Sequence, residues 1–264
     1  MKNIPKDIFK SKPEVKYDKY LFREISTEEY NANKINNFKS KIKNNQKLYR
    51  FLIELFSPVF TFYSNRYLKS FISENYKNKD QVFLNLGSGN SIIGDDIINV
   101  DFFPYLNVDI VCDIENLPFK DNSIDIISNI AVLEHVPNPE AVVKEIYRVL
   151  KSTGKIYSVV PFMQGYHASP YDFTRRTSEG MKVLYKDFSI EKLLCIGGPT
   201  SGLLWILQDW VAILFSFGSK KLHSIIYYLM LLLLWPIKLL DFILIHHPLA
   251  KNITSAFLVI GEKK

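Results

Sequence analysis

The chain contains very little cysteine: Cys112 and Cys195 are the only two among 264 residues. Each lies inside an apolar run, which is typical of reduced core thiols, excludes a disulfide framework and favours the cytosol. The five histidines form no ligand-spaced cluster apart from His246 and His247, so we expect no metal site. Those two adjoin an apolar segment, and we expect them to be interfacial residues.

Other signals are absent as well. No period of a few tens of residues recurs, which excludes a repeat protein. Residues 1–12 are polar and charged, so we expect no secretory signal peptide. With 47% hydrophobic and 14% aromatic residues, the chain is too apolar to be disordered, and 264 residues are enough for one substantial core.

The formal net charge of +6 is concentrated near the N-terminus. Residues 1–80 hold 17 Lys and Arg against 9 Asp and Glu, which leaves 16 against 18 for the remainder. Such an excess attracts anionic membranes or nucleic acid, but a Lys/Asn-rich composition also produces it with no partner at all. Because no basic stripe interleaved with aromatic residues accompanies it, a nucleic-acid partner is disfavoured.

The first eighty residues carry weak patterns. Residues 1–45 show no sustained period and predict a loosely structured leader or a short irregular cap, with little function. Apolar residues at helical spacing predict an amphipathic helix over 46–62, and a second helix is expected over 65–75. The predicted organisation is a leader with helices over 1–80 and one domain over 81–264.

Short apolar runs then alternate with turns and helical segments. Runs of this length at this spacing predict a parallel sheet covered on both faces. The best-defined helix follows Asn138, with Pro139 at its first position and Gly154 beyond its end. The predicted strands cover residues 82–86, 97–100, 108–112, 124–128 and 155–160.

Gly87 and Gly89 directly follow the first of these strands. Glycine lets the backbone turn sharply and approach a ligand closely at the switch point of a doubly wound sheet. Asp101 and Asp113 end the next two strands, so two carboxylates are expected beside the glycine turn. An acid after the second strand is suited to binding ribose hydroxyls, and the set predicts a ribose-containing ligand.

Residues 82–162 resemble the class I S-adenosylmethionine-dependent methyltransferases, in particular the type 11 methyltransferases. The motifs that carry the resemblance are LNLGSGN, INVD and VDIVCDIENLPFKDNSIDIISNIAVLEHVPNPEAVVKEIYRVLKSTGKIYSVVPF. The resemblance implies an α/β fold: a Rossmann-like, doubly wound, mostly parallel seven-stranded sheet with an antiparallel C-terminal strand. S-adenosyl-L-methionine is the implied cofactor. The residues that the resemblance assigns to it are Gly87 and Gly89 beside the methionine part, Asp101 at the ribose, Asp113 with the Ile114 backbone at the adenine, and Asn129 and Ile130 along the same cleft.

Two features depart from the family pattern. Ser91 stands where many members have a third glycine, and the eleven residues between Gly89 and Asp101 are too few for the usual first helix. We interpret both as a variant of the site, with a non-catalytic methyltransferase-fold partner or scaffold as the alternative. A nicotinamide dehydrogenase is disfavoured because the G-x-G-x-x-G pattern is incomplete.

Methyl transfer to oxygen or nitrogen is an in-line displacement, in which positioning supplies much of the rate. If the acceptor is a hydroxyl, a base helps to remove its proton, and the candidates are His135 and His167. The loop around His167 also offers Tyr171, Asp172 and Arg175 as acceptor-binding residues. Arg175 is suited to an acceptor phosphate or carboxylate, or equally to pairing with Asp172.

The last two strands, expected over 190–196 and 254–260, flank an apolar helical insertion over 202–248. A single membrane crossing would place the closing strand on the wrong side of the membrane. A hairpin dipping into one leaflet or lying along the interface avoids this. Two full crossings also avoid it, at the cost of burying Gln208 and Asp209. A soluble lid or a dimer surface is the remaining alternative.

Together these patterns predict a cytoplasmic enzyme, peripheral or monotopic at the inner face of a membrane. Its expected partner is a small-molecule, lipid-linked or glycan-like acceptor. A soluble enzyme, in which the insertion over 202–248 covers a hydrophobic small molecule, is the alternative within the same reaction class.

Overall fold

The computed structural model describes residue 2, residues 4–34 and residues 57–264. Within these residues one nine-stranded sheet runs in the order β1-β2-β5-β4-β3-β6-β7-β9-β8. The strands are β1 (Glu14–Lys16), β2 (Lys19–Leu21), β3 (Phe83–Leu86), β4 (Ile98–Asp101), β5 (Ile110–Val111), β6 (Ile124–Ile130), β7 (Leu150–Pro161), β8 (Phe188–Ile196) and β9 (Ala256–Lys263). The α-helices are α1 (Thr27–Lys34), α4 (Phe62–Asn75), α5 (Pro139–Val149), α6 (Ser178–Leu184), α7 (Pro199–Ser216), α8 (Lys220–Leu234) and α9 (Asp241–Leu244).

The middle of the sheet has the expected doubly wound topology. Strands β5, β4, β3, β6 and β7 are parallel neighbours, and the order proceeds outward from β3 on one side and from β6 on the other. The C-terminal strand β9 lies between β7 and β8 and is antiparallel to both. The predicted Rossmann-like α/β fold is therefore confirmed, and ligands of such sheets bind where the order reverses, at the carboxyl ends of the strands.

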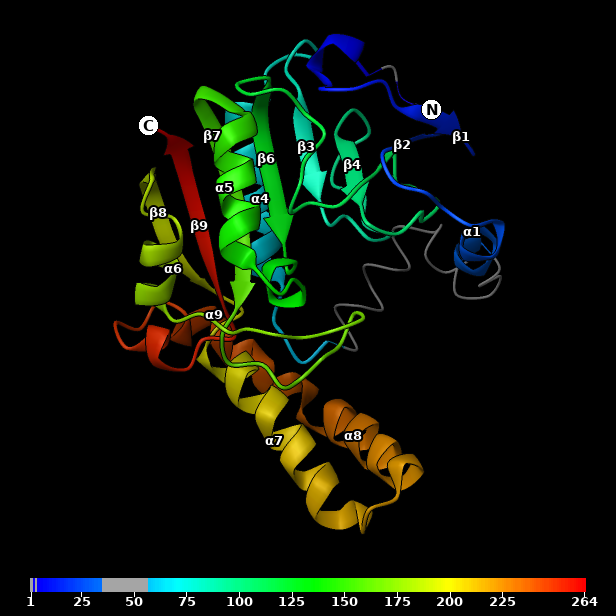
Figure 1. Cartoon of the computed structure of the whole chain (residues 1–264). Coiled ribbons are helices and arrows are strands. Elements are labelled where there is room, and N and C mark those ends of the chain that lie inside the picture. The colour runs from blue at the N-terminus through cyan, green and yellow to red at the C-terminus, as the bar shows by residue number, and fades with distance from the viewer. Residues whose placement is uncertain (1, 3, 35–56) are drawn as a thin grey trace.

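Helices cover both faces of this sheet (Figure 1). On one face Val142 and Ile146 of α5 are fully buried in the cluster that contains Leu84. On the other face Phe71 of α4 packs in the cluster that contains Tyr157. The α5 start is as predicted, because the Asn138 side chain accepts a hydrogen bond from the Ala141 backbone N–H at 3.0 Å.

The prediction of a loose leader was wrong for the described part of residues 1–45. Strand β2 pairs in parallel with β5, with Tyr20 opposite Ile110, so the leader extends the sheet beyond the seven predicted strands. Ile8 and Phe9 are buried in the main core. Strands of three residues are too short to show a period, which explains why the pattern missed them.

The two predicted N-terminal helices have different outcomes. The helix over 65–75 is confirmed as α4. The helix over 46–62 falls mostly on residues 35–56, outside the described residues, and residues 57–61 are not helical. Residues 87–97, between β3 and β4, contain turns and no helix, as the short spacing predicted.

The apolar insertion is a helical hairpin that projects from the sheet at the edge where the parallel strands end (Figure 1). Helix α7 forms one arm, and α8, a 3₁₀ segment over Trp235–Leu240 and α9 form the other. One helix in the described part of the chain, Lys220–Leu244, is long and apolar enough to cross a membrane, judged by length and composition alone.

Three of the polar residues that interrupt the insertion are buried. Gln208 is 1% exposed, Lys238 is 1% exposed and Asp241 is fully buried. Lys238 donates to the Ser57 carbonyl, and Asp241 accepts from the backbone N–H groups at the start of α7. The outward surface of the hairpin is therefore much more apolar than its sequence, and large apolar side chains on it are more than half exposed: Trp210, Ile213, Leu214, Phe215, Phe217, Ile225, Tyr228, Leu229, Leu232, Leu233, Leu240 and Ile243.

Candidate active site

The glycine turn directly after β3 has the backbone that its sequence predicts. Gly87 and Gly89 have φ of +63° and +52°, in the left-handed region where a side chain is strained. A Cβ at Gly87 would lie 2.5 Å from the Val132 side chain, whereas a Cβ at Gly89 would meet nothing within 4 Å. Position 87 therefore requires glycine both for its backbone conformation and for its packing against Val132. Gly89 borders open space in which a ligand fits.

Asp101 ends β4 beside this turn and is 7% exposed. Its carboxylate accepts the Gly89 backbone N–H at 2.7 Å and the Phe103 backbone N–H at 2.9 Å. Burial raises the pKa of Asp101, and these backbone hydrogen bonds act in the opposite direction. The carboxylate is held rigidly at the cleft, as a ribose-binding group requires.

Asp113 and Ile114 follow β5 on the same edge of the sheet. Asp113 is exposed and accepts the Glu115 backbone N–H at 2.9 Å, whereas Ile114 is 7% exposed. An exposed carboxylate next to a buried apolar side chain suits a flat, polar-edged ring such as adenine.

These residues meet in one cleft of about 520 Å³, within the ordinary size range of small-molecule sites. The lining includes the predicted Gly87, Gly89, Asp101, Asp113, Ile114, His135 and Tyr171, together with Phe102, Phe103, Tyr105, Glu115, Ala131, Val132, Val136, Pro137, Ser169, Pro170 and Phe173. The cleft thus contains five of the proposed cofactor residues, one proposed base and one proposed acceptor residue.

Aromatic walls of the cleft were missed by the sequence reasoning. Phe102, Phe103 and Tyr105 follow Asp101 in the stretch FFPY, a signal that was present in the sequence. Arg23, from the leader, donates to the Phe102 carbonyl at 2.8 Å and lies over its ring at 4.1 Å. The leader therefore supports one wall of the cleft, although little function was expected of it.

Asn129 and Ile130 do not line the cleft, unlike the other predicted cofactor residues. Asn129 lies opposite Leu86 and Ser158 in the sheet and is 1% exposed. Since side chains alternate along a strand and β6 ends at Ile130, Ala131 and Val132 are the residues that reach the cleft instead.

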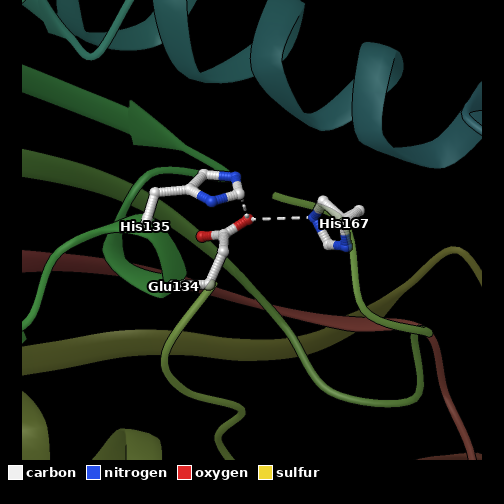
Figure 2. Close-up of side chains that lie close together, drawn as sticks. All are labelled: Glu134, His135 and His167. Atoms are coloured by element: carbon white, nitrogen blue, oxygen red, sulfur yellow. Dashed lines mark ion pairs between the residues drawn. The ribbon is translucent and has the colours of Figure 1, made fainter. Parts of the chain in front are cut away.

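His135 and His167 lie together beside a carboxylate, Glu134, that the sequence reasoning did not single out (Figure 2). Nε2 of His135 is 3.7 Å from Glu134 Oε1, and Nε2 of His167 is 3.8 Å from the same oxygen. The Glu134 side chain is fully buried. Interaction with Glu134 raises the pKa of His167, and burial opposes that rise.

The proposed acceptor residues have separate surroundings. Tyr171 is 62% exposed and lines the cleft. Arg175 pairs with Asp172 through two nitrogens and also donates to the carbonyls of Gln164 and Gly165. The guanidinium holds the pKa of Asp172 at about 2. The pair therefore fixes the loop, and an additional role in acceptor binding stays a prediction.

A second hollow, of about 240 Å³, separates this loop from the hairpin. His167 lines it, and the Trp205 ring lies 5.3 Å from the His167 ring. Across the hollow, His223 Nε2 is 2.9 Å from Asp209 Oδ1. Its remaining lining residues are Tyr166, Ser224, Tyr227 and Tyr228. A larger hollow of about 450 Å³, near Tyr63 and His246, contains none of the predicted site residues.

Residues 94–158 match a family model described as a methyltransferase domain, and this stretch contains Asp101, Asp113, Glu134 and His135. The similarity to a methyltransferase domain thus covers about a quarter of the chain. The sheet extends beyond the matched residues, because β3 with its glycine turn precedes them and β8 and β9 follow.

Solved structures with the same fold are only distantly similar in sequence. Phosphoethanolamine N-methyltransferase 2 of Haemonchus contortus is 16% identical with a TM-score of 0.50, over 81% of this chain and 56% of that one. The YcgJ protein of Bacillus subtilis is 15% identical with a TM-score of 0.47, over 75% of this chain and 97% of that one. No curated protein sequence matches this chain. At these identities the likeness concerns the fold.

Proposed function

We propose that this protein transfers a methyl group from S-adenosylmethionine to an oxygen or nitrogen atom of a small-molecule, lipid-linked or glycan-like acceptor at the cytosolic face of a membrane. The observation that carries the proposal is the meeting of Gly87, Gly89, Asp101 and Asp113 in one cleft. They come from the ends of three adjacent parallel strands, β3, β4 and β5, where a doubly wound sheet binds its ligand.

The residues of the cleft fit S-adenosylmethionine. The open space above Gly89 admits the methionine part close to the backbone, and the anchored Asp101 carboxylate accepts hydrogen bonds from ribose hydroxyls. The exposed Asp113 carboxylate accepts from the adenine amine, while Ile114 and Phe102 contact the ring faces. Each part of the cofactor thus has a partner of matching polarity.

The bound cofactor supplies a methyl group on a positively charged sulfur, and the chain positions the acceptor in line with it. His135 lines the cleft and His167 lines the second hollow, so the Glu134 cluster lies between the cofactor side and the hairpin side. The proton of a hydroxyl acceptor is lost at this cluster. An amine acceptor needs only to arrive unprotonated.

The hairpin supports a membrane-surface location. Its outward face is apolar, and the charged side chains Lys220 and Lys221 stand at the tip between α7 and α8. Inserting the tip first would place two ammonium groups in hydrocarbon, at about 2.5–3.5 kcal/mol each near the membrane centre. We therefore propose that the hairpin lies along the interface, where lysines reach lipid headgroups.

The second hollow supports an amphipathic acceptor. Trp205 and Tyr227 provide aromatic faces, and the Asp209–His223 pair provides hydrogen-bonding groups, a combination that suits a polyol or sugar. The exposed apolar side of the hairpin begins next to this hollow, so a lipid tail fits along it. The polar part of such an acceptor would then extend toward His167.

Transfer of labelled methyl tests this proposal. Full-length protein and tritiated S-adenosylmethionine are incubated with the organic-soluble or the aqueous extract of cell membranes or of cytosol, each in its own reaction. We expect label to enter an organic-soluble product with wild type and not with Asp101→Ala. Label only with the cytosolic extracts, and none with the membrane extracts, would favour the soluble alternative, in which the hairpin covers a hydrophobic small molecule.

A non-catalytic partner that uses this fold is the second candidate. The observation that favours it is the segment 87–97, which has no helix and carries Ser91 in place of a glycine. Binding of S-adenosylmethionine without label transfer to any of the four fractions, together with co-purification of a second protein, would make this the better account.

A further inference from the structure

Three metal-binding atoms converge just beyond the end of β6. Glu134 and His135 lie in a 3₁₀ turn, Leu133–His135, and His167 lies in the loop after β7 (Figure 2). One atom from each side chain lies within 4.8 Å of the other two. Glu134 Oε1 is the atom that both ring nitrogens face, at 3.7 and 3.8 Å.

Glu134 provides a second observation, independent of this spacing. Its carboxylate is fully buried, and neither oxygen accepts a hydrogen bond from any described residue. A buried carboxylate without donors or a cation costs several kcal/mol. A cation held between this carboxylate and the two ring nitrogens would balance it.

Hydrogen bonding identifies which ring nitrogens are free. His135 Nδ1 lies 2.6 Å from the Tyr171 carbonyl oxygen, and His167 Nδ1 lies 3.0 Å from the Gly165 carbonyl oxygen. Because a carbonyl only accepts, each Nδ1 carries a hydrogen, and Nε2 is the nitrogen that each ring turns toward Glu134. Metal-binding histidines are oriented by this same contact with a backbone carbonyl.

Arg175 does not change this assignment. Its Nη2 lies 3.3 Å from His167 Nδ1, but it donates to Asp172 at 2.7 Å and to the Gly165 carbonyl at 3.0 Å. Those two shorter contacts use both hydrogens of that nitrogen.

We propose that Glu134, His135 and His167 bind a divalent first-row transition-metal ion. Ligand bonds of 2.0–2.2 Å place neighbouring ligand atoms roughly 3.0–3.5 Å apart, so the two separations from Glu134 Oε1, 3.7 and 3.8 Å, need to close by a few tenths of an ångström. Two histidines and one carboxylate on one side of an ion leave its other coordination positions open. The sequence expectation of no metal site missed this set because 32 residues separate His135 from His167.

The location gives the ion a role that rests on the proposed function. His135 faces the cofactor cleft and His167 faces the hollow beside the hairpin, so the open positions lie between the two. There the ion binds an acceptor hydroxyl and lowers its pKa. The hydroxyl proton passes to water, the oxygen lone pair forms the new O–C bond, and the S–C bond breaks with its electron pair returning to the sulfonium sulfur.

Metal titration tests the site without requiring turnover. Full-length protein is freed of metal with a chelator and titrated with Zn²⁺ by calorimetry and with Mn²⁺ by electron paramagnetic resonance. We expect one ion per chain, with binding weakened at least about tenfold in Glu134→Gln and in His167→Ala. His247→Ala serves as the control, because His246 and His247 are the other neighbouring histidines.

Each outcome decides the proposal. No stoichiometric binding by wild type, or equal binding by wild type and both cluster variants, overturns it, and so does loss of binding in His247→Ala alone. Glu134→Gln keeps the shape of a buried side chain, and His167→Ala changes a partly exposed one, so at least one variant should fold, as judged by circular dichroism. Titration of S-adenosylmethionine into the same samples separates the two claims: retained cofactor binding without metal binding rejects only the ion.

Discussion

At the scale of a single residue, two opposing effects act on the pKa of Asp101. Burial disfavours its charge, and the N–H groups of Gly89 and Phe103 favour it, with burial the larger effect. Its pKa is therefore above the ordinary value for an aspartic acid. The carboxylate form is the one that accepts hydrogen bonds from ribose, so the protonation of one buried side chain controls the proposed cofactor site.

The affinity for S-adenosylmethionine should consequently fall as the pH is lowered. Protonation removes acceptor capacity from Asp101, and because its pKa is raised, the fall begins at a higher pH than it would for an ordinary carboxyl group. Calorimetric titrations of S-adenosylmethionine, at pH values chosen between 7.5 and 4.5, measure this loss of affinity. Asp101→Asn should bind weakly with a much flatter pH profile, and parallel profiles for the two proteins would contradict this role.

Residue identity predicted part of the site and burial determined the rest. Gly87, Gly89, Asp101 and Asp113 were predictable because each lies at or just beyond the carboxyl end of a strand, and these ends meet at one edge of a parallel sheet. Asn129 and Ile130 were misplaced because β6 continues to Ile130, so the next two residues, Ala131 and Val132, line the cleft. Glu134 could not be predicted as a site residue, because the sequence shows neither that its side chain is buried nor that its carboxylate lacks hydrogen-bond donors.

At the scale of elements, α7 depends on a carboxylate from the other arm of the hairpin. Asp241 is fully buried and accepts from the backbone N–H groups of Thr200 and Ser201, each at 2.8 Å, and from the Ser201 hydroxyl at 2.6 Å. These N–H groups belong to the first turn of α7 and have no partner within the helix. A negative charge at this end also complements the helix dipole.

Asp241→Ala should therefore destabilise the protein by about 2–4 kcal/mol, because it leaves buried donors unsatisfied. Urea unfolding followed by circular dichroism measures the change in the free energy of unfolding. Asn138→Ala is the matched control: it removes an exposed cap of α5 and should cost about 1 kcal/mol. Equal effects of the two substitutions would contradict the importance of this buried contact.

Sequence patterns predicted the long elements better than the short ones. The strands that became β3, β6 and β7 and the helix α5 follow from hydrophobic runs and caps. Strands β1 and β2 were missed because they have three residues each, and β2 is stabilised by pairing with β5, which only the fold reveals. Lys238 and Asp241 looked like interruptions of an apolar span, but both are buried at its base.

At the scale of the whole molecule, the hairpin places a broad apolar surface at the same edge of the sheet as the cofactor cleft (Figure 1). Exposed apolar patches of this extent mark interaction sites. The proposed occupant is the membrane interface, which would bring the second hollow next to lipid-linked acceptors.

Vesicle flotation tests this location. We expect wild type to float with anionic phospholipid vesicles, and the double variant Phe217→Glu/Leu233→Glu to partition at least about tenfold less, a difference of about 1.4 kcal/mol. Val183→Glu, on α6, introduces the same charge at a side chain that is 68% exposed outside the hairpin and should float like wild type. A wild type that stays with the soluble fraction as a dimer would contradict the membrane proposal and favour a dimer surface.

The central claim is that the cleft beside Gly87 binds S-adenosylmethionine. The most direct test is calorimetric titration of S-adenosylmethionine into full-length wild type, Asp101→Ala, Asp113→Ala and the exposed control Asp187→Ala. The account predicts binding on the order of micromolar, weakened tenfold or more, about 1.4 kcal/mol, by each of the two cleft substitutions and unchanged in the control. A well-folded wild type that binds no S-adenosylmethionine would contradict the account.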